Sequence, residues 1–195
     1  TEAAFHYRHF TMVVNGEGIP ALDKGIQYPE GLNTARYITP LMERFFGVLY
    51  RAFFNELEPH IYLTHAILIF TLLSLLGVFF AGRALWGSWW IGLVCCLIYG
   101  LAPASFSRAL TTSFVRENFA LPFIFLSLAC FLFCFRKDRA WLSVVASMLF
   151  VIALAAWHVS QLFLTILMVG LSGLFLIYGI DVLPRKSLRV FVGFM

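Results

Sequence analysis

Charge is what this sequence has least of. Lys, Arg, Asp and Glu together make up 12% of the 195 residues, whereas hydrophobic residues make up 61%. A soluble domain usually carries about 25% charged residues. This composition therefore excludes an ordinary soluble enzyme and is typical of a membrane protein. We expect membrane lipids around the chain and no nucleic-acid partner.

Several other features are missing. No Met and no signal-peptide pattern stand at the start, so we expect a piece of a longer membrane protein, with helices before Thr1 and after Met195. No internal repeat is evident, which disfavours the inverted halves of many transporters. The four cysteines lie in apolar runs; a metal or redox pair at Cys130 and Cys134 stays open, but small helix-packing residues are the favoured interpretation.

Long apolar runs dominate the rest of the sequence. Five of them approach the ~20 residues that a helix needs to cross a bilayer. They lie near Ile61–Ala81, Leu85–Leu101, Phe119–Phe135, Trp141–Trp157 and Gln161–Ile180. The fold class predicted from them is all-α, a polytopic transmembrane helical bundle with a long first external loop.

The charges divide between the two ends of these spans. If residues 1–60 face outside, the loops on the inside are short and rich in Lys and Arg, as in Arg136 and Lys137, whereas the outer segments hold most of the acidic residues. Basic loops face the cytoplasm in membrane proteins. We therefore predict an integral, multi-pass protein, in the plasma (inner) membrane if prokaryotic, with its active loops on the outer face.

Three regions follow from this topology. Residues 1–60 form the first external loop with interfacial helices, residues 61–180 form the transmembrane bundle, and residues 181–195 form a cytoplasmic loop and the start of a further helix. Within the loop, residues 1–14 can form a helix with Phe5, His9, Met12 and Val13 along one side. Residues 37–54 mix aromatic with charged residues, which suits a helix at the interface or under other helices.

Two carboxylates on the predicted outer side need an explanation. Charges beside a bilayer are costly unless they are paired, solvated or bound to a cation. Glu2 and Glu117 could together hold a divalent cation, Mn²⁺ or Mg²⁺, through oxygen ligands. Arg108 and Arg116 flank Glu117 and are candidates to bind phosphate. The simpler interpretation pairs Glu117 with an arginine or with a helix N-terminus, and leaves Glu2 solvated.

The first of these carboxylates opens a longer pattern. "EAAFHYR", followed by "NGEGIP" and "YPEG", resembles the first external loop of the catalytic subunits of N-glycan oligosaccharyltransferases, within the class-C glycosyltransferases. Glu2 falls at the position of the catalytic, metal-binding Asp of that family. The residues that match in spacing are Phe5, Tyr7, Arg8, Asn15, Gly16, Tyr28, Pro29 and Gly31.

Two later stretches are also similar to that family. The second external loop matches at Pro103, Ser107, Arg108, Thr112, Phe114, Glu117 and Ala120, and "AAWHVSQLF" matches through Trp157 and Phe163. Two positions depart from the pattern. Glu2 replaces an Asp, and Val115 stands where the family has the first Asp of its second-loop pair. The lost ligand leaves His158 or His6 as substitutes, although a hydrogen-bonded interfacial histidine is the favoured role for each.

The resemblance implies a metal-dependent membrane glycosyltransferase. Its donor would be a polyprenyl- or dolichyl-linked (pyro)phosphate sugar, and its acceptor most simply an Asn of a polypeptide. Glu2 would contact acceptor and cation, and Glu117 would bind the metal. Related enzymes that modify a lipid, a glycan or Ser/Thr would use the same residues. A non-catalytic membrane subunit is the remaining alternative.

Overall fold

The computed structural model describes residues 2–27, 29–34, 39–109, 114–137 and 139–178. The predicted all-α class is confirmed, because helices make up nearly all of the described regular structure. The elements in chain order are α1 (Glu2–Val14), β1 (Leu22–Asp23), β2 (Leu32–Asn33), α3 (Leu41–Leu49), the π-helical turn η1 (Tyr50–Phe54), α4 (Pro59–Trp86), α5 (Trp89–Leu101), α6 (Pro103–Ala109), α7 (Arg116–Lys137), α8 (Ala140–Ala156) and α9 (Ser160–Tyr178).

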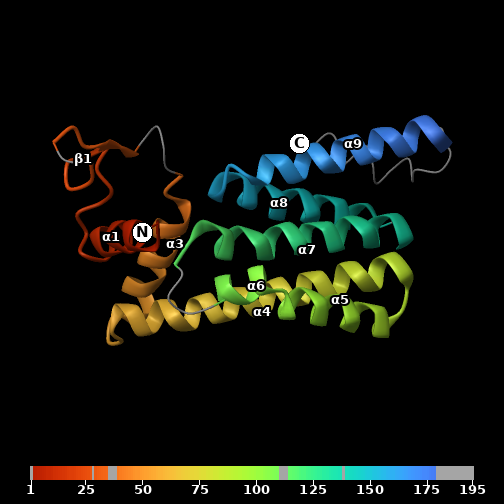
Figure 1. Cartoon of the computed structure of the whole chain (residues 1–195), viewed down its shortest axis with the longest axis horizontal. Helices are drawn as coiled ribbons and strands as arrows, with labels where there is room; N and C mark the ends of the chain where they lie inside the picture. Colours follow the sequence, from red (N-terminus) through yellow and green to blue (C-terminus); the bar gives the residue numbers. More distant parts are fainter. Residues whose placement is uncertain (1, 28, 35–38, 110–113, 138, 179–195) are drawn as a thin grey trace.

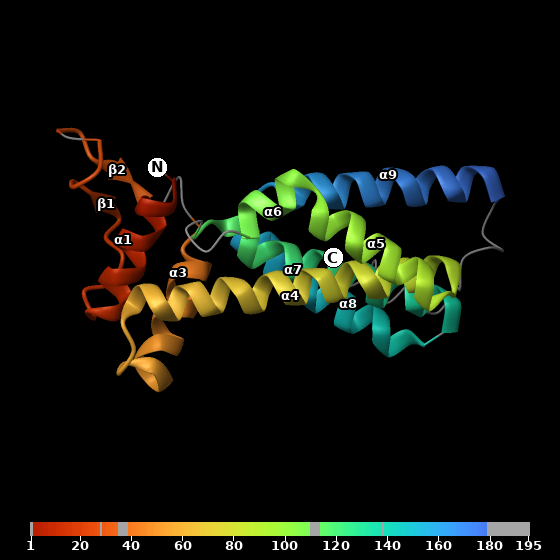
Figure 2. The ribbon, with the colours of Figure 1, turned by 60° about the horizontal axis from the view of Figure 1, so that its bottom comes forward.

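The helices form two parts of different character. Helices α4 to α9 lie side by side as an elongated bundle, and α1, α3 and the β1–β2 hairpin gather at one end of it (Figure 1). In the turned view, α1 stands across the direction of α4 (Figure 2). The strands are antiparallel, with Leu22 opposite Asn33 and Asp23 opposite Leu32.

Small residues set the close packing inside the bundle. A Cβ atom added to Gly77 of α4 would lie 2.6 Å from Cβ of Phe125 in α7. A Cβ on Gly92 of α5 would lie 2.8 Å from the carbonyl oxygen of Phe79 in α4. Ser127 of α7 donates a hydrogen bond of 2.7 Å to the carbonyl oxygen of Ala146 in α8. Small residues at such contacts let helix backbones approach closely, as in membrane bundles.

The predicted spans overlap helices, but their bounds differ. The span near Leu85–Leu101 crosses the turn at Gly87 and Ser88, since α5 begins only at Trp89, and the end of Gln161–Ile180 lies outside the described residues. Helix α4 continues past the predicted end at Ala81 as far as Trp86, and the guanidinium of Arg83 in its last turn lies 3.5 Å from the ring centre of Trp89 in α5. Gly87 then ends it at a φ of 76°, and its N–H donates to the carbonyl oxygen of Arg83.

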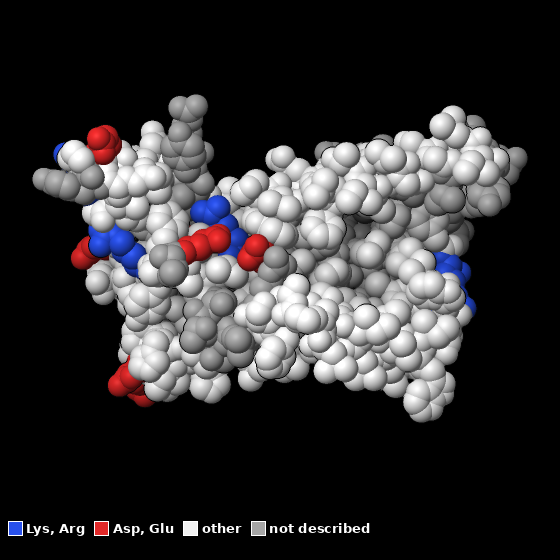
Figure 3. Space-filling view, viewed as in Figure 1, with Lys and Arg blue, Asp and Glu red and all other residues white. Residues whose placement is uncertain are grey.

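Two described helices, α4 and α7, are long and apolar enough to cross a membrane. Three shorter apolar stretches, Trp89–Leu101, Ala140–Ala156 and Ser160–Gly170, accompany them. In the view of Figure 3, the middle of the bundle surface carries no Lys, Arg, Asp or Glu, and the charged side chains lie toward its two ends. The crossing of the membrane by all five spans stays a prediction.

Helix α1 is fastened to the end of the bundle. A Cβ on Gly47 of α3 would lie 2.5 Å from Cγ1 of Val13, so the two helices touch closely there. Phe10 is fully buried, stacked on Tyr62 of α4 and edge-on to Phe114, just before α7. The predicted helix over residues 1–14 is confirmed, but its buried side is His6, His9 and Phe10. This docking brings the first turn of α1 toward the start of α7.

Candidate functional site

The first turn of α1 presents a carboxylate to a histidine. Glu2 and His6 are four residues apart and therefore share one face of the helix. Oε1 of Glu2 lies 3.4 Å from Nε2 of His6. The Glu2 side chain is 65% exposed, whereas that of His6 is 1% exposed. One end of this contact faces solvent and the other lies inside the protein.

The buried side of His6 meets a second carboxylate. Nδ1 of His6 lies 2.6 Å from Oε1 of Glu43 in α3, whose side chain is fully buried. Glu43 shares the packed face of α3 with Met42, Phe46 and Gly47, which explains its burial. Its second oxygen, Oε2, has no hydrogen-bond partner within the described part of the chain. A buried carboxylate is stable only when it is paired, and His6 supplies that pairing.

Arg116 adds a positive charge from the first turn of α7. Its side chain is 8% exposed, and it lies within electrostatic range of the carboxylates of Glu43 and Glu2. Its Nε atom has no hydrogen-bond partner among the described residues. Glu2, His6, Glu43 and Arg116 thus meet from three helices, and we call them the junction site. Figure 3 shows acidic and basic side chains together where α1 meets the bundle.

A second histidine–carboxylate pair lies three residues further along α1. Nε2 of His9 is 3.1 Å from Oδ2 of Asp23, in the hairpin. Arg8 donates to both oxygens of Asp23, at 3.0 and 3.1 Å, and the Gly25 N–H donates to Oδ1 at 2.9 Å. These hydrogen bonds, with Arg8 first, lower the pKa of Asp23 to about 2. Arg8, one of the residues that match the family pattern, is thus the partner of Asp23.

The remaining predicted site residues are placed differently. Glu117 follows Arg116 in the first turn of α7 and is half-buried, where the helix dipole favours a negative charge. Arg108 belongs to α6, but its side chain is outside the described residues. His158 is exposed in the turn between α8 and α9. The structure therefore brings Glu2, His6 and Arg116 together, with Glu117 beside Arg116 in the chain.

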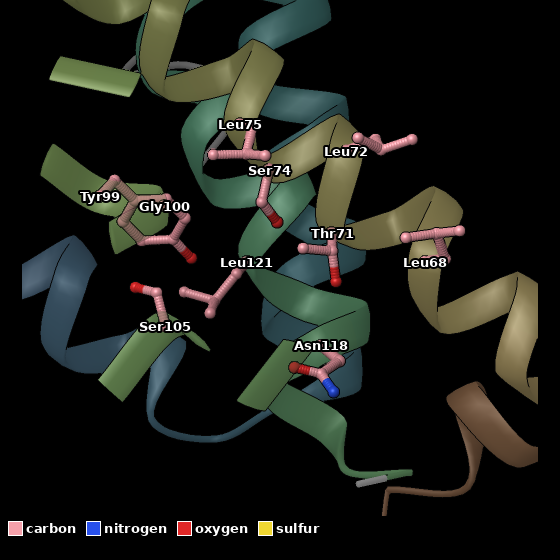
Figure 4. Close-up of a pocket in the computed structure, with 10 residues that line it drawn as sticks. All are labelled: Leu68, Thr71, Leu72, Ser74, Leu75, Tyr99, Gly100, Ser105, Asn118 and Leu121. Atoms are coloured by element: carbon pink, nitrogen blue, oxygen red, sulfur yellow. The ribbon is translucent and has the colours of Figure 1, made fainter. Parts of the chain in front are cut away.

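A pocket opens in the bundle next to this region. It has a volume of about 220 Å³ and is lined by α4, α5, α6 and α7 (Figure 4). Its wall is largely aliphatic, with the polar groups of Thr71, Ser74, Tyr99, Ser105 and Asn118. Asn118 is the neighbour of Glu117 in the chain, so the pocket begins close to the start of α7. The lining suits a ligand with an apolar body and a few polar groups.

A comparison with family models identifies the family of this chain. The model of the Dpy19 family, described as "Q-cell neuroblast polarisation", matches residues 1–194. The chain belongs to the Dpy19 family. Dpy19 is a membrane family of glycosyltransferase type, so the coarse class predicted from the sequence holds. The match is to Dpy19 and not to an oligosaccharyltransferase catalytic subunit. A comparison with curated protein sequences gave no match.

The side chains of this Dpy19 chain do not fit the metal site that the resemblance implies. Within the described residues, no group of three or more His, Cys, Asp or Glu side chains has an arrangement that could hold a metal ion. In the junction site, His6 contacts Oε1 of Glu2, and Arg116 already places a positive charge near both carboxylates. We therefore derive no step through a metal ion.

Sequence reasoning missed Glu43 and Asp23. Glu43 had a detectable signal, because positions 43, 46, 47 and 50 follow the spacing of one helix face, and the other three residues are Phe, Gly and Tyr. A carboxylate on such a stripe must be buried and paired. Asp23 had no such signal, because it lies in a turn-rich segment where an aspartate is ordinary.

Proposed function

We propose that this chain carries the catalytic base and the phosphate-binding arginine of a membrane glycosyltransferase. The donor is a sugar linked through phosphate to a polyprenyl or dolichyl lipid, and the acceptor is a polypeptide. Because Dpy19 proteins are C-mannosyltransferases, the transfer that we favour is of mannose to a carbon atom. The junction site carries the proposal, since it combines one exposed carboxylate with one buried cation.

The chemistry needs both groups. The bond between C1 of the sugar and the phosphate oxygen breaks, and its electron pair leaves with the phosphate. The acceptor atom bonds to C1, and its proton passes to Oε2 of Glu2, the oxygen that does not face His6. In this proposal, the guanidinium of Arg116 stabilises the charge that develops on the departing phosphate. Glu2 then releases the proton to solvent.

The bundle supports a donor that comes from the membrane. The pocket in Figure 4 is apolar enough to take an isoprenoid segment and has hydroxyl and amide groups toward the start of α7. A phosphate joined to that segment would lie between the pocket and Arg116. We infer that the protein is multi-pass, with this end on the outer face, because Arg83, Arg136 and Arg139 lie at the turns of the opposite end.

A second candidate is oligosaccharyl transfer to Asn. The ordered matches at Asn15–Gly16 and Glu117, with Glu2 at the position of the catalytic Asp, favour it, and the same base and arginine would serve. The two candidates differ in the product. A carbon–carbon bond survives an amidase that releases Asn-linked glycans, and a single hexose differs in mass from an oligosaccharide. Mass spectrometry of acceptor peptides before and after amidase treatment therefore separates them.

The test of the proposed function is Glu2→Gln in membranes that contain the protein and a lipid-linked sugar donor. We expect transfer to fall by roughly 10²–10⁴-fold, the usual contribution of a general base, with thermal stability unchanged. Glu56→Gln is the matched control, because Glu56 is exposed and lies outside the junction site. Full activity of Glu2→Gln would reject the assignment, and a wild-type protein without transfer would favour the non-catalytic subunit.

A further inference from the structure

The junction site contains an unbroken path of contacts from solvent to the interior. Glu2 is largely exposed, His6 is buried behind it, and Glu43 is fully buried behind His6. The rings of Phe5 and Phe114 stand edge-on to the imidazole at 5.1 and 6.5 Å between ring centres. The histidine is therefore fixed by packing as well as by its two carboxylate contacts.

We propose that His6, held by Glu43, is a positioning residue for Glu2. It binds Oε1 of Glu2 and leaves Oε2 directed at the acceptor proton. This inference rests on the proposed function, because it assigns a role to the residues behind the base. The proposal gives a functional role to Glu43, the residue of the junction site that the sequence analysis did not name.

The hydrogen bonds leave few arrangements of protons. A neutral imidazole has one N–H and one acceptor nitrogen, whereas both nitrogens of His6 face carboxylate oxygens. If Nε2 donates to an ionised Glu2, Nδ1 either donates to an ionised Glu43 as part of an imidazolium or accepts from a protonated Glu43 on a neutral ring. One proton is shared between Glu43 and His6 in either case, and Nε2 donates to Glu2. With Arg116 included, the net charge of the junction site is zero in both arrangements.

An exposed glutamate in a first helical turn needs such a holder. Its side chain has several accessible rotamers, and a base acts only when it lies within hydrogen-bond reach of the proton that it takes. A buried donor with a single orientation selects one rotamer before the substrate arrives. Misplacement of a reacting group by about 1 Å can cost roughly 10²-fold in rate.

The test separates holding Glu2 from holding the fold. The amide nitrogen of Asn lies as many bonds from the backbone as Nδ1 of histidine, and that of Gln as many as Nε2. His6→Asn therefore keeps a donor toward Glu43 and loses the one toward Glu2, and His6→Gln does the opposite. We expect His6→Gln to retain within about 10-fold of the wild-type kcat and His6→Asn to lose roughly 10²-fold, with KM for the donor little changed.

Stability should follow the reverse order. His6→Gln leaves Glu43 buried without its partner and should have the lower Tm, whereas His6→Asn keeps that pair. The matched control is His9, also buried against a carboxylate on the same helix. His9→Asn and His9→Gln should both keep kcat within about threefold, because no contact joins His9 to Glu2 among the described residues. A kcat of His6→Asn equal to or above that of His6→Gln would overturn the positioning role.

A second measurement needs no variant of His6 and no activity. In protein labelled with ¹⁵N-histidine, Glu2→Gln should shift the Nε2 signal of His6, and Glu56→Gln should leave it unchanged. An unmoved Nε2 signal would reject the contact even if both His6 variants fail to fold. If the wild-type protein transfers no sugar, the proposed function fails, whereas this signal still decides whether His6 holds Glu2.

Discussion

Helix α1 carries two buried histidine–carboxylate pairs, one three residues after the other, and they are built differently. Asp23 is saturated, since it accepts from Arg8, His9 and the Gly25 N–H. Glu43 shares one hydrogen bond with His6 through Oε1, and its Oε2 has no partner within the described residues. The second ring nitrogen of His6, Nε2, contacts the exposed Glu2. The second ring nitrogen of His9, Nδ1, has no hydrogen-bond partner among the described residues.

The difference separates a pair that fixes the fold from a pair that serves a site. The His9–Asp23 pair joins α1 to the hairpin, and the exposed group bound to it is a cation, the 45% exposed Arg8. The His6–Glu43 pair joins α1 to α3 and ends on a carboxylate in solvent. Burial, pairing and a link to an exposed group are thus common to both, and the second differs because its exposed group is a carboxylate held by the histidine, whereas that of the first is an arginine held by the carboxylate.

The two arginines give the largest contrast. Arg116→Met removes the positive charge beside Glu2 and Glu43, and transfer should fall by roughly 10²–10³-fold, the usual cost of losing one charge-stabilising donor. Arg8→Met removes the partner of Asp23 instead and should keep kcat within about threefold while Tm falls. Initial rates with lipid-linked donor and thermal unfolding of the same preparations measure both effects.

Arg116→Lys refines this comparison. A lysine keeps the charge but not the planar pair of donors that suits phosphate, so rescue should be partial. Arg44→Met is a control for general loss of charge, because Arg44 is exposed and lies next to Glu43 in the chain. A wild-type transfer rate in Arg116→Met would contradict the distinction between a pair that serves the site and a pair that fixes the fold. An equal loss of transfer in Arg8→Met would contradict it as well.

Substitutions of the two buried carboxylates, Glu43 and Asp23, should show the same contrast: the first lowers kcat and the second lowers stability. Glu43→Gln keeps the shape of the side chain but not the charge that orients His6, and kcat should fall roughly 10- to 100-fold, in the range of one misplaced catalytic group. Asp23→Asn should leave kcat near wild type and lower stability by about 1–3 kcal/mol, because a buried hydrogen-bond network loses its negative charge and one of its two acceptor oxygens. Measurements of kcat and Tm on both variants test this contrast. Equal losses of kcat in the two variants would contradict it.

How far the sequence leads depends on the kind of signal. Apolar runs fix the helices, so the spans and the all-α class follow from the sequence. Glu2 stands out because a carboxylate near a bilayer needs an explanation. The burial of Glu43 can be inferred from helix periodicity, because it shares one helix face with Phe46, Gly47 and Tyr50. The meeting of α1, α3 and α7 does not follow, because aromatic packing around Phe10 decides it. The pairing of Arg8 with Asp23 likewise depends on how the hairpin folds back.

The pH dependence of stability sharpens the assignment of the saturated pair. The pKa of Asp23 falls from an ordinary value near 3.8 to about 2, so its stabilisation is complete above about pH 4 and is lost as the pH falls to 2. The contribution should be roughly 1–2 kcal/mol, reduced from the full shift because Arg8 is partly exposed. Thermal unfolding of wild type and Asp23→Asn should therefore differ at pH 5 and converge near pH 2. A constant difference would place the stabilising charge elsewhere.

Chelation of divalent cations should have the smallest effect and tests whether the exposed end of the His6–Glu43 pair is a base or a ligand. The sequence pattern predicts Mn²⁺ or Mg²⁺ at Glu2 and Glu117, but a cation on Oε1 of Glu2 would compete with the proton on Nε2 of His6 and would be repelled by Arg116. We therefore expect EDTA to change transfer by less than about twofold, since Arg116 supplies the charge that a metal ion would otherwise bring. Loss of transfer in EDTA, restored by Mn²⁺ and not by added salt, would make Glu2 a metal ligand. The two pairs on α1 would then differ in what they bind, and His6 would hold a ligand in place rather than a base.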